Sequence, residues 1–133
     1  MIPCAAGRFL AKRPAFFFAT SGRGGGIRRA MFDLRIANNV ARLTLNRPQA
    51  RNAIPAASWA KLGDTAEAAV RGGARLLLVQ GAGEAFCAGA DLGDFAAMQS
   101  DAGAAARFRL AMRDGLDRLG ALPIPTAALI EGA

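Results

Sequence analysis

The sequence predicts a single α/β domain that begins near Met31. Two observations predict this class: helical patterns over 55–71 and over 102–119 are each followed by a short apolar run that is typical of a buried strand. A length of 133 residues suits one hydrophobic core, and a composition of 53% apolar and 20% charged residues is typical of soluble globular proteins. No apolar run approaches the roughly 18 residues that span a bilayer, so we expect no membrane partner.

Residues 1–30 differ in composition from the rest of the chain. They carry six lysine and arginine residues and no acid, whereas residues 31–133 carry eleven bases and ten acids. The net charge of +7 therefore comes almost entirely from this part, which we expect to be a disordered basic leader. An upstream start with Met31 as the true initiator is the favoured explanation; a mitochondrial presequence and a nucleic-acid-binding tail are the alternatives.

Cysteine and histidine usage narrows the compartment and the chemistry. The spacing of Cys4 and Cys87 is not that of a disulfide framework, so we expect a reducing compartment. This compartment is the cytoplasm or, if residues 1–30 are a presequence, the mitochondrial matrix. The chain contains no histidine, which excludes Ser-His and Cys-His nucleophile pairs and most transition-metal sites. We expect no metal, and no nucleic-acid partner because the bases outside the leader are balanced by acids.

The first expected elements form a β-hairpin. Apolar runs over 34–36 and 40–45 flank Asn38-Asn39, a pair that tolerates the positive φ angles of a tight turn. Arg47-Pro48 ends the second strand because proline has no N–H for a ladder.

A helix and a strand follow the hairpin. Pro55 suits the first position of a helix to about Arg71, with Trp59, Leu62, Ala66 and Val70 on one apolar stripe. Gly72-Gly73 ends this helix, and the uninterrupted run from Leu76 to Val79 predicts a strand buried on both faces in a parallel sheet.

A second helix and strand complete the pattern. The helix over 102–119 places Phe108, Met112, Leu116 and Leu119 on one stripe, which predicts core packing. Thr126 to Ile130 then predicts another buried strand.

The stretch from Gly81 to Leu92 is the candidate site, because ligands favour the carboxyl end of a parallel strand. Small residues over 88–90 let a ligand approach the main chain closely. Asp91 is placed to cap or begin a short helix whose free N–H groups point back toward that ligand, which predicts an oxyanion site. A tight turn with close packing is the alternative that this pattern leaves open.

Three blocks of sequence resemble the enoyl-CoA hydratase/isomerase (crotonase) family. Residues 43–54, LTLNRPQARNAI, resemble the family's first motif, and residues 86–92, FCAGADL, resemble its oxyanion motif. Residues 123–132, PIPTAALIEG, resemble the strand that leads into its triple-glycine loop. The resemblance covers the chain from about Met31 and matches the family's N-terminal half, which implies a crotonase-like ββα spiral core truncated after that strand.

The resemblance also implies a site. Its first oxyanion donor is the backbone N–H of Ala90, which would bind the carbonyl oxygen of an acyl-CoA thioester and stabilise its enolate during hydration or isomerisation. The substrate-binding positions that it implies are Arg51 and Ala53 against coenzyme A, Ala88 and its neighbours Gly89 and Asp91 at the adenine amino group, and Leu92 near the base. Arg51 could equally be a solvated loop arginine.

For an intact family member the resemblance implies a homotrimer or hexamer, and coenzyme A enters as part of the substrate, so no separate cofactor is expected. A second oxyanion donor from the triple-glycine segment and the acids that transfer protons are expected beyond Ala133; they would decide the reaction. A truncated relic or non-catalytic interaction module is the alternative function.

Four further residues near these motifs have simpler interpretations. Cys87 has no neighbouring base, which argues against a catalytic thiol. Asn52 is expected to secure the turn by bonding to the backbone rather than to contact substrate. Glu84 and Asp94 could line the pocket, but exposed charge is the expectation for both.

Overall fold

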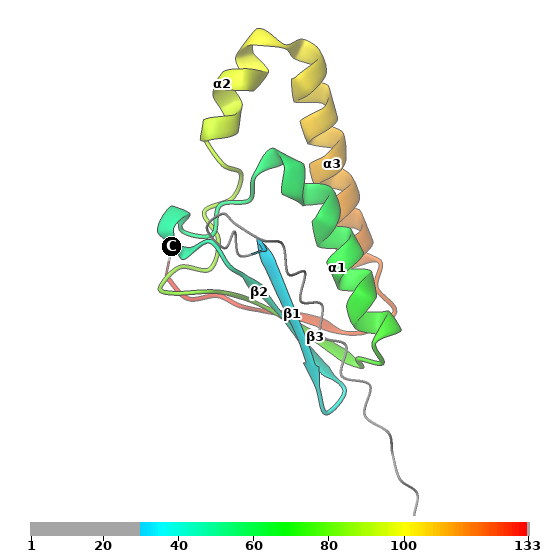
Figure 1. The fold of residues 1–133 in the computed structure, drawn as a ribbon. Coiled ribbons are helices and arrows are strands. Elements are labelled where there is room, and N and C mark those ends of the chain that lie inside the picture. The colour runs from blue at the N-terminus through cyan, green and yellow to red at the C-terminus, as the bar shows by residue number, and fades with distance from the viewer. Residues whose placement is uncertain (1–29, 133) are drawn as a thin grey trace, which may run out of the picture.

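A four-stranded mixed sheet with the strand order β1-β2-β3-β4 forms the base of the structure (Figure 1). The computed structural model describes residues 30–132, so the predicted disordered leader lies almost wholly outside the described residues. The elements are β1 (Phe32–Ala37), β2 (Val40–Leu45), the 3-10 helices η1 (Pro48–Ala50) and η2 (Ala56–Ser58), α1 (Trp59–Arg71), β3 (Leu76–Gly81), α2 (Gly93–Ser100), α3 (Ala102–Gly120) and β4 (Thr126–Leu129).

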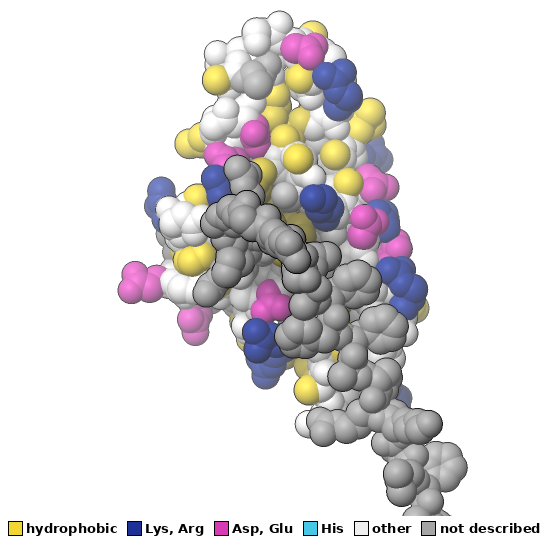
Figure 2. Space-filling view, in the orientation of Figure 1, with side chains coloured by type: hydrophobic (Ala, Val, Ile, Leu, Met, Phe, Trp, Pro, Cys, Tyr) yellow, Lys and Arg dark blue, Asp and Glu magenta, His cyan; other side chains and the backbone are white. Residues whose placement is uncertain are grey.

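Charges of both signs are interspersed over α1 and α3 on the face shown in Figure 2. Ion pairs between the two helices account for part of this pattern, because the Arg118 guanidinium contacts Asp64 at 2.7 Å and Glu67 at 2.7 Å. Within residues 30–132, no helix is long and apolar enough to cross a membrane.

The hairpin forms where Asn38-Asn39 predicts it. Asn38 and Asn39 have φ angles of 50° and 61°, so both adopt the left-handed conformation that a tight hairpin turn requires. β1 and β2 pair antiparallel from Phe32 opposite Leu45 to Ala37 opposite Val40.

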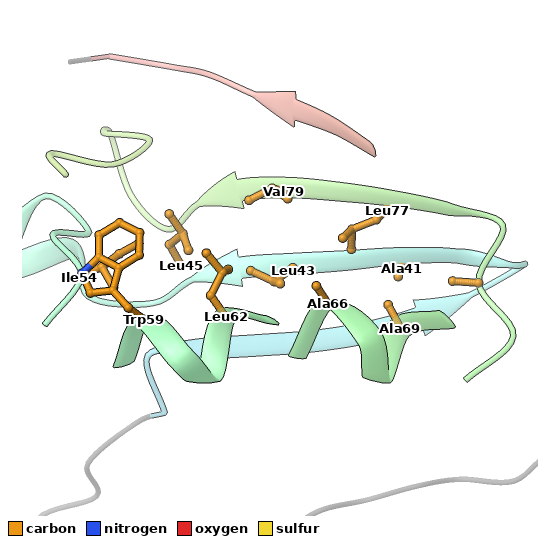
Figure 3. Packing of buried hydrophobic residues seen from close by; sticks show 11 residues of the cluster. Ala41, Leu43, Leu45, Ile54, Trp59, Leu62, Ala66, Ala69, Leu77 and Val79 are labelled. Carbon is orange, nitrogen blue, oxygen red and sulfur yellow. The ribbon is translucent and has the colours of Figure 1, made fainter. Parts of the chain in front are cut away.

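Both remaining strand pairings are parallel, as the helix-then-strand patterns predict. β3 pairs with β2 after the α1 crossover, and β4 pairs with β3 after α2 and α3. The core lies between the sheet and α1, where Leu43 and Leu77, both with no exposed surface, meet Leu62 and Ala66 of α1 (Figure 3). α3 packs against α1, and the helices lie on one face of the sheet (Figure 1).

The prediction that β3 is buried on both faces is wrong, and so is the prediction that β4 is buried. In β3 only Leu77 and Val79 are buried, whereas Leu76 and Leu78 on the opposite face are half-buried, and every residue of β4 is exposed. An uninterrupted apolar run indicates that both faces suit burial, but within residues 30–132 only one face of the sheet carries a helix layer.

Two details of the helices also differ from expectation. α1 begins at Trp59, because Pro55 remains extended and precedes the 3-10 turn η2. On α3, Phe108, Met112 and Leu119 pack against the core as predicted, but Leu116 is 47% exposed. Gly115 takes the buried position instead, where α3 approaches α1 closely.

Candidate functional site

The turn between β2 and α1 is fixed by a buried asparagine. Arg51 and Asn52 follow η1 with φ angles of 46° and 56°. Asn52 is fully buried; its Oδ1 accepts from the Arg47 backbone N–H at 2.9 Å, and its Nδ2 donates to the carbonyls of Ala82 at 2.9 Å and Ala85 at 2.7 Å. These bonds confirm the interpretation that Asn52 secures the turn, and they also tie it to the loop after β3.

The turn runs parallel to residues 88–91 and is hydrogen-bonded to them. The Ala88 N–H donates to the Arg51 carbonyl at 2.8 Å, and the Ile54 N–H donates to the Gly89 carbonyl at 2.7 Å. A third bond runs from the Asp91 N–H to the Ile54 carbonyl at 3.1 Å. Segments about forty positions apart in the sequence, which carry most of the predicted site residues, are thus side by side.

Ala90 is bracketed by these bonds but does not use its own N–H in them. In the parallel bridge between Ile54 and Ala90, Ile54 bonds to the residues on either side of Ala90. Within residues 30–132 the Ala90 N–H has no hydrogen-bond acceptor. Ala90 is half-buried, so this donor is available to a ligand or to water.

Gly89 leaves space beside that donor. Its φ angle of +90° is one that other residues rarely adopt, and a Cβ built on it would meet no atom within 4 Å. The preceding residue, Ala88, is exposed. The backbone at 88–90 is therefore open to close approach, as its small side chains predict.

Asp91 organises the start of α2. Its Oδ1 accepts from the Gly93 N–H at 2.9 Å, and its other carboxylate oxygen pairs with the Arg47 guanidinium. The Gly93 N–H and then Arg47 lower the pKa of the Asp91 carboxyl below its usual range.

The expectation that free N–H groups of this helix point toward a ligand is not met. The N-cap residue of α2 is Leu92 rather than Asp91, but the Asp91 carboxylate occupies the Gly93 N–H, and the N–H groups of Asp94 and Phe95 bond to the carbonyls of Asp91 and Leu92. The Ala90 N–H, ahead of the helix, has no acceptor within residues 30–132.

The other predicted substrate-binding positions lie around the same turn. The Arg51 side chain is exposed, and Leu92 is 81% exposed, so both are accessible. Ala53 is buried, with 8% of its surface exposed, and its carbonyl accepts from the Arg47 side chain at 3.2 Å.

The neighbouring residues have structural partners. Glu84 is exposed, as expected, but Asp94 is half-buried and its carboxylate accepts from the Ala56 N–H at 2.6 Å, which links α2 to the start of η2. The Cys87 thiol donates to the Asn52 carbonyl at 3.3 Å. Among the described residues no group of three or more Cys, Asp or Glu side chains could hold a metal ion.

Sequence reasoning missed Arg47 as a member of the site. Its guanidinium bonds to the Ala53 carbonyl and to the Asp91 carboxylate. Asp91 lies 44 positions from Arg47 in the sequence. The available signal was the position of Arg47 within the block at 43–54 that carries the family resemblance, but nothing local identifies its partner.

Two hollows lie near the site. One of about 220 Å³ is at the carboxyl ends of β3 and β4, between Gln80, Phe86 and Leu129. The other, of about 320 Å³, is lined mainly by apolar side chains of α2 and α3, among them Phe95, Met98 and Phe108. Neither hollow is lined by Ala90.

Comparison with known proteins identifies the family. The model of the enoyl-CoA hydratase/isomerase family matches residues 35–133, so the chain belongs to this family. It is 36% identical over 98 residues to a probable enoyl-CoA hydratase of Rhodobacter capsulatus, covering 74% of this chain and 37% of that protein. A probable enoyl-CoA hydratase of Mycobacterium tuberculosis is 35% identical over 101 residues, covering 75% and 39%.

Solved structures agree on the fold. AtuE of Pseudomonas aeruginosa superposes with a TM-score of 0.71 at 37% identity, over 78% of this chain and 41% of that one. An enoyl-CoA hydratase/isomerase family protein of Hyphomonas neptunium gives a TM-score of 0.71 at 31% identity, over 77% and 40%. The predicted crotonase-like α/β fold is thereby confirmed, and the chain spans about 40% of the length of these relatives.

Proposed function

We propose that the chain binds an acyl-CoA thioester and that the Ala90 N–H donates to the thioester carbonyl oxygen. The unpaired Ala90 N–H beside the open Gly89 backbone carries this proposal. Family membership supports it, because relatives of this chain are named probable enoyl-CoA hydratases.

The chemistry follows from where charge develops. When a proton leaves the carbon next to the thioester, or water adds to the conjugated double bond, negative charge collects on the carbonyl oxygen as an enolate. A donor fixed in advance stabilises that charge without reorganising, and one such donor typically contributes about 3 kcal/mol to the transition state. The Ala90 N–H therefore serves hydration and isomerisation equally well.

Arg51 supports the coenzyme A part of the proposal. Its exposed guanidinium stands on the turn that is hydrogen-bonded to Ala88 at 2.8 Å, close in the fold to the donor segment. A guanidinium suits the phosphates of coenzyme A, whose charge it would meet in a bidentate geometry.

Calorimetry of the expressed chain tests the proposal. An enoyl-CoA is titrated into the wild-type chain and into Ala90→Pro, which has no N–H at this position, with free coenzyme A as the control ligand. A neutral hydrogen bond contributes about 1 kcal/mol, so we expect acyl-CoA affinity to fall about fivefold in the variant and coenzyme A affinity to remain unchanged.

Two controls make the result interpretable. Ala90→Gly retains the N–H and should bind acyl-CoA more tightly than Ala90→Pro. Proline also restricts the conformation of the preceding residue, so circular dichroism must show that Ala90→Pro is folded; if it is not, an amide-to-ester replacement at Ala90 removes the same donor. A folded wild-type chain that binds no acyl-CoA would instead support the relic or interaction module.

A further inference from the structure

The direction of the Ala90 N–H is set by a single peptide group, the one that joins Gly89 to Ala90. A trans peptide is planar, so its C=O and N–H point in opposite directions. The Ile54 N–H donates to the Gly89 carbonyl at 2.7 Å, which turns the Ala90 N–H away from Ile54. This bond also polarises the peptide and so strengthens the donor at its other end.

Side-chain packing constrains this peptide on one side only. The Ala90 methyl packs partly against the core, but no atom lies within 4 Å of a Cβ placed on Gly89. Glycine also has more backbone freedom than any other residue. Hydrogen bonds from the turn at 53–54 must therefore supply the remaining constraint.

Arg47 joins that turn to the segment that carries the donor. Its Nη1 donates to the Ala53 carbonyl at 3.2 Å and to the Asp91 carboxylate. Ala53 precedes Ile54, and Asp91 follows Ala90. This one guanidinium nitrogen therefore links the two segments that pair through Ile54 and Ala90.

The Arg47 backbone is itself held in place, and its side chain is partly shielded from water. Its backbone N–H donates to the buried Asn52 side chain at 2.9 Å, and its side chain is 31% exposed against 22% for Asp91. A charge-assisted hydrogen bond that is partly shielded from water is stronger than a solvated surface pair. Arg47 thus acts as a clamp that holds Ala53 against Asp91, next to the donor at Ala90.

We propose that Arg47 is a positioning residue that aims the Ala90 N–H by clamping Ala53 to Asp91. This inference rests on the proposed function, since the aim of the donor matters only if a thioester oxygen binds there. Arg47 acts through Asp91 and Ala53 and does not need to contact the ligand.

The test compares Arg47→Met with Arg118→Met. Arg118 is a matched control: it is also an ion-paired arginine, with 29% of its side chain exposed, but it joins α1 to α3 away from the donor. Loss of the contacts of either arginine lowers stability, so an effect on the ligand that is seen only in Arg47→Met reports on positioning. Because one nitrogen of Arg47 makes both contacts, Arg47→Lys is expected to restore much of the effect.

The readout is the infrared stretch of the thioester carbonyl in but-2-enoyl-CoA labelled with ¹³C at that carbon. Hydrogen bonding lowers this frequency, so the wild-type chain should shift the band and Arg118→Met should preserve the shift. Arg47→Met should return the band toward its position in free solution, with recovery in Arg47→Lys. Amide hydrogen exchange at Ile54 should accelerate in Arg47→Met alone, which tests the clamp without a ligand.

The outcomes separate the two proposals. A folded wild-type chain that leaves the carbonyl band unshifted contradicts the proposed function. A shifted band in the wild type that persists in Arg47→Met, or that is lost equally in Arg118→Met, overturns the positioning role alone. If Arg47→Met does not fold, Asp91→Asn replaces it, because it neutralises the carboxylate that Arg47 binds.

Discussion

Gly115 of α3 lies directly against the Trp59 carbonyl at the start of α1, so that a Cβ on Gly115 would stand 2.2 Å from that oxygen. No real Cβ tolerates this distance from a backbone atom, so the two helices pack closely here only because residue 115 has no side chain. The contact sets the spacing between α1 and α3.

Gly115→Ala should therefore destabilise the chain even though alanine favours helices. Forcing a methyl into a packed interface costs about 1–3 kcal/mol, which exceeds the gain of about 1 kcal/mol in helix propensity. Urea unfolding followed by circular dichroism should show a lower midpoint. Gly120→Ala is the control, because nothing lies within 4 Å of a Cβ there; an equal loss in both variants would contradict the close contact.

Asn52→Ala should cost more than about 2 kcal/mol of unfolding free energy. The change leaves the Ala82 and Ala85 carbonyls and the Arg47 N–H without the partner that Asn52 supplies, and unsatisfied buried groups cost about 1–3 kcal/mol each. Asn52→Gly isolates the backbone contribution, because the φ angle of 56° suits glycine and strains alanine by about 1–2 kcal/mol. If both variants unfold at the same urea concentration, the strain contribution is absent.

Stability should fall in acid because three carboxyls have lowered pKa values. Hydrogen bonding from Arg118 lowers the pKa of Glu67, the Gly93 N–H lowers that of Asp91, and backbone N–H groups at the start of α3 lower that of Asp101. Folding favours the ionised forms, so their contribution is fully present above the ordinary values of 4.5 and 3.8 and is lost as the pH falls through the lower folded values.

Urea midpoints measured from pH 7 to pH 2.5 check this sign. We expect little change between pH 5.5 and 7, since the chain has no histidine, and a steep loss below about pH 4. Glu67→Gln should flatten part of that loss. A midpoint that rises as the pH falls would show that burial of these carboxyls outweighs their hydrogen bonds.

The β4 edge should promote self-association of this chain. β4 is an edge strand of the described sheet, its residues are all exposed, and Leu129 and Ile130 have 45% and 69% of their surfaces exposed. Open strand edges with apolar residues pair with other chains. Leu129→Lys and Ile130→Lys should each lower the apparent mass in sedimentation at high concentration.

Leu116→Lys is the matched control for this edge, because Leu116 is 47% exposed but lies on α3. It should reduce association less than the variants at Leu129 and Ile130. A larger effect at Leu116 would assign the association to the helix surface rather than to the strand edge.

The elements were predictable from the sequence because their limits are set by local chemistry. Asn38-Asn39 accepts the two positive φ angles of the hairpin, and α1 ends at Arg71 immediately before Gly72-Gly73. The small residues at 88–90 likewise indicate a backbone that a ligand could approach, and the structure leaves Ala90 with a free N–H there.

Features that depend on distant partners were not predictable. A continuous apolar run such as 76–79 does not reveal whether a layer covers its second face. Leu116 and Gly115 are adjacent, and which of them faces α1 depends on how closely the helices approach. Arg47 finds Asp91 only after the turn and the loop after β3 have folded together, so the ion pair has no local signature.

The amide signal of Ala90 in ¹⁵N-resolved NMR, followed during titration with but-2-enoyl-CoA, reports directly on the proposed hydrogen bond. If the Ala90 N–H donates to the thioester oxygen, its proton resonance moves downfield with the acyl-CoA and stays in place with free coenzyme A. Binding of the acyl-CoA with no movement at Ala90, while other amides shift, would show that the thioester oxygen lies elsewhere and that the Ala90 N–H is not its donor.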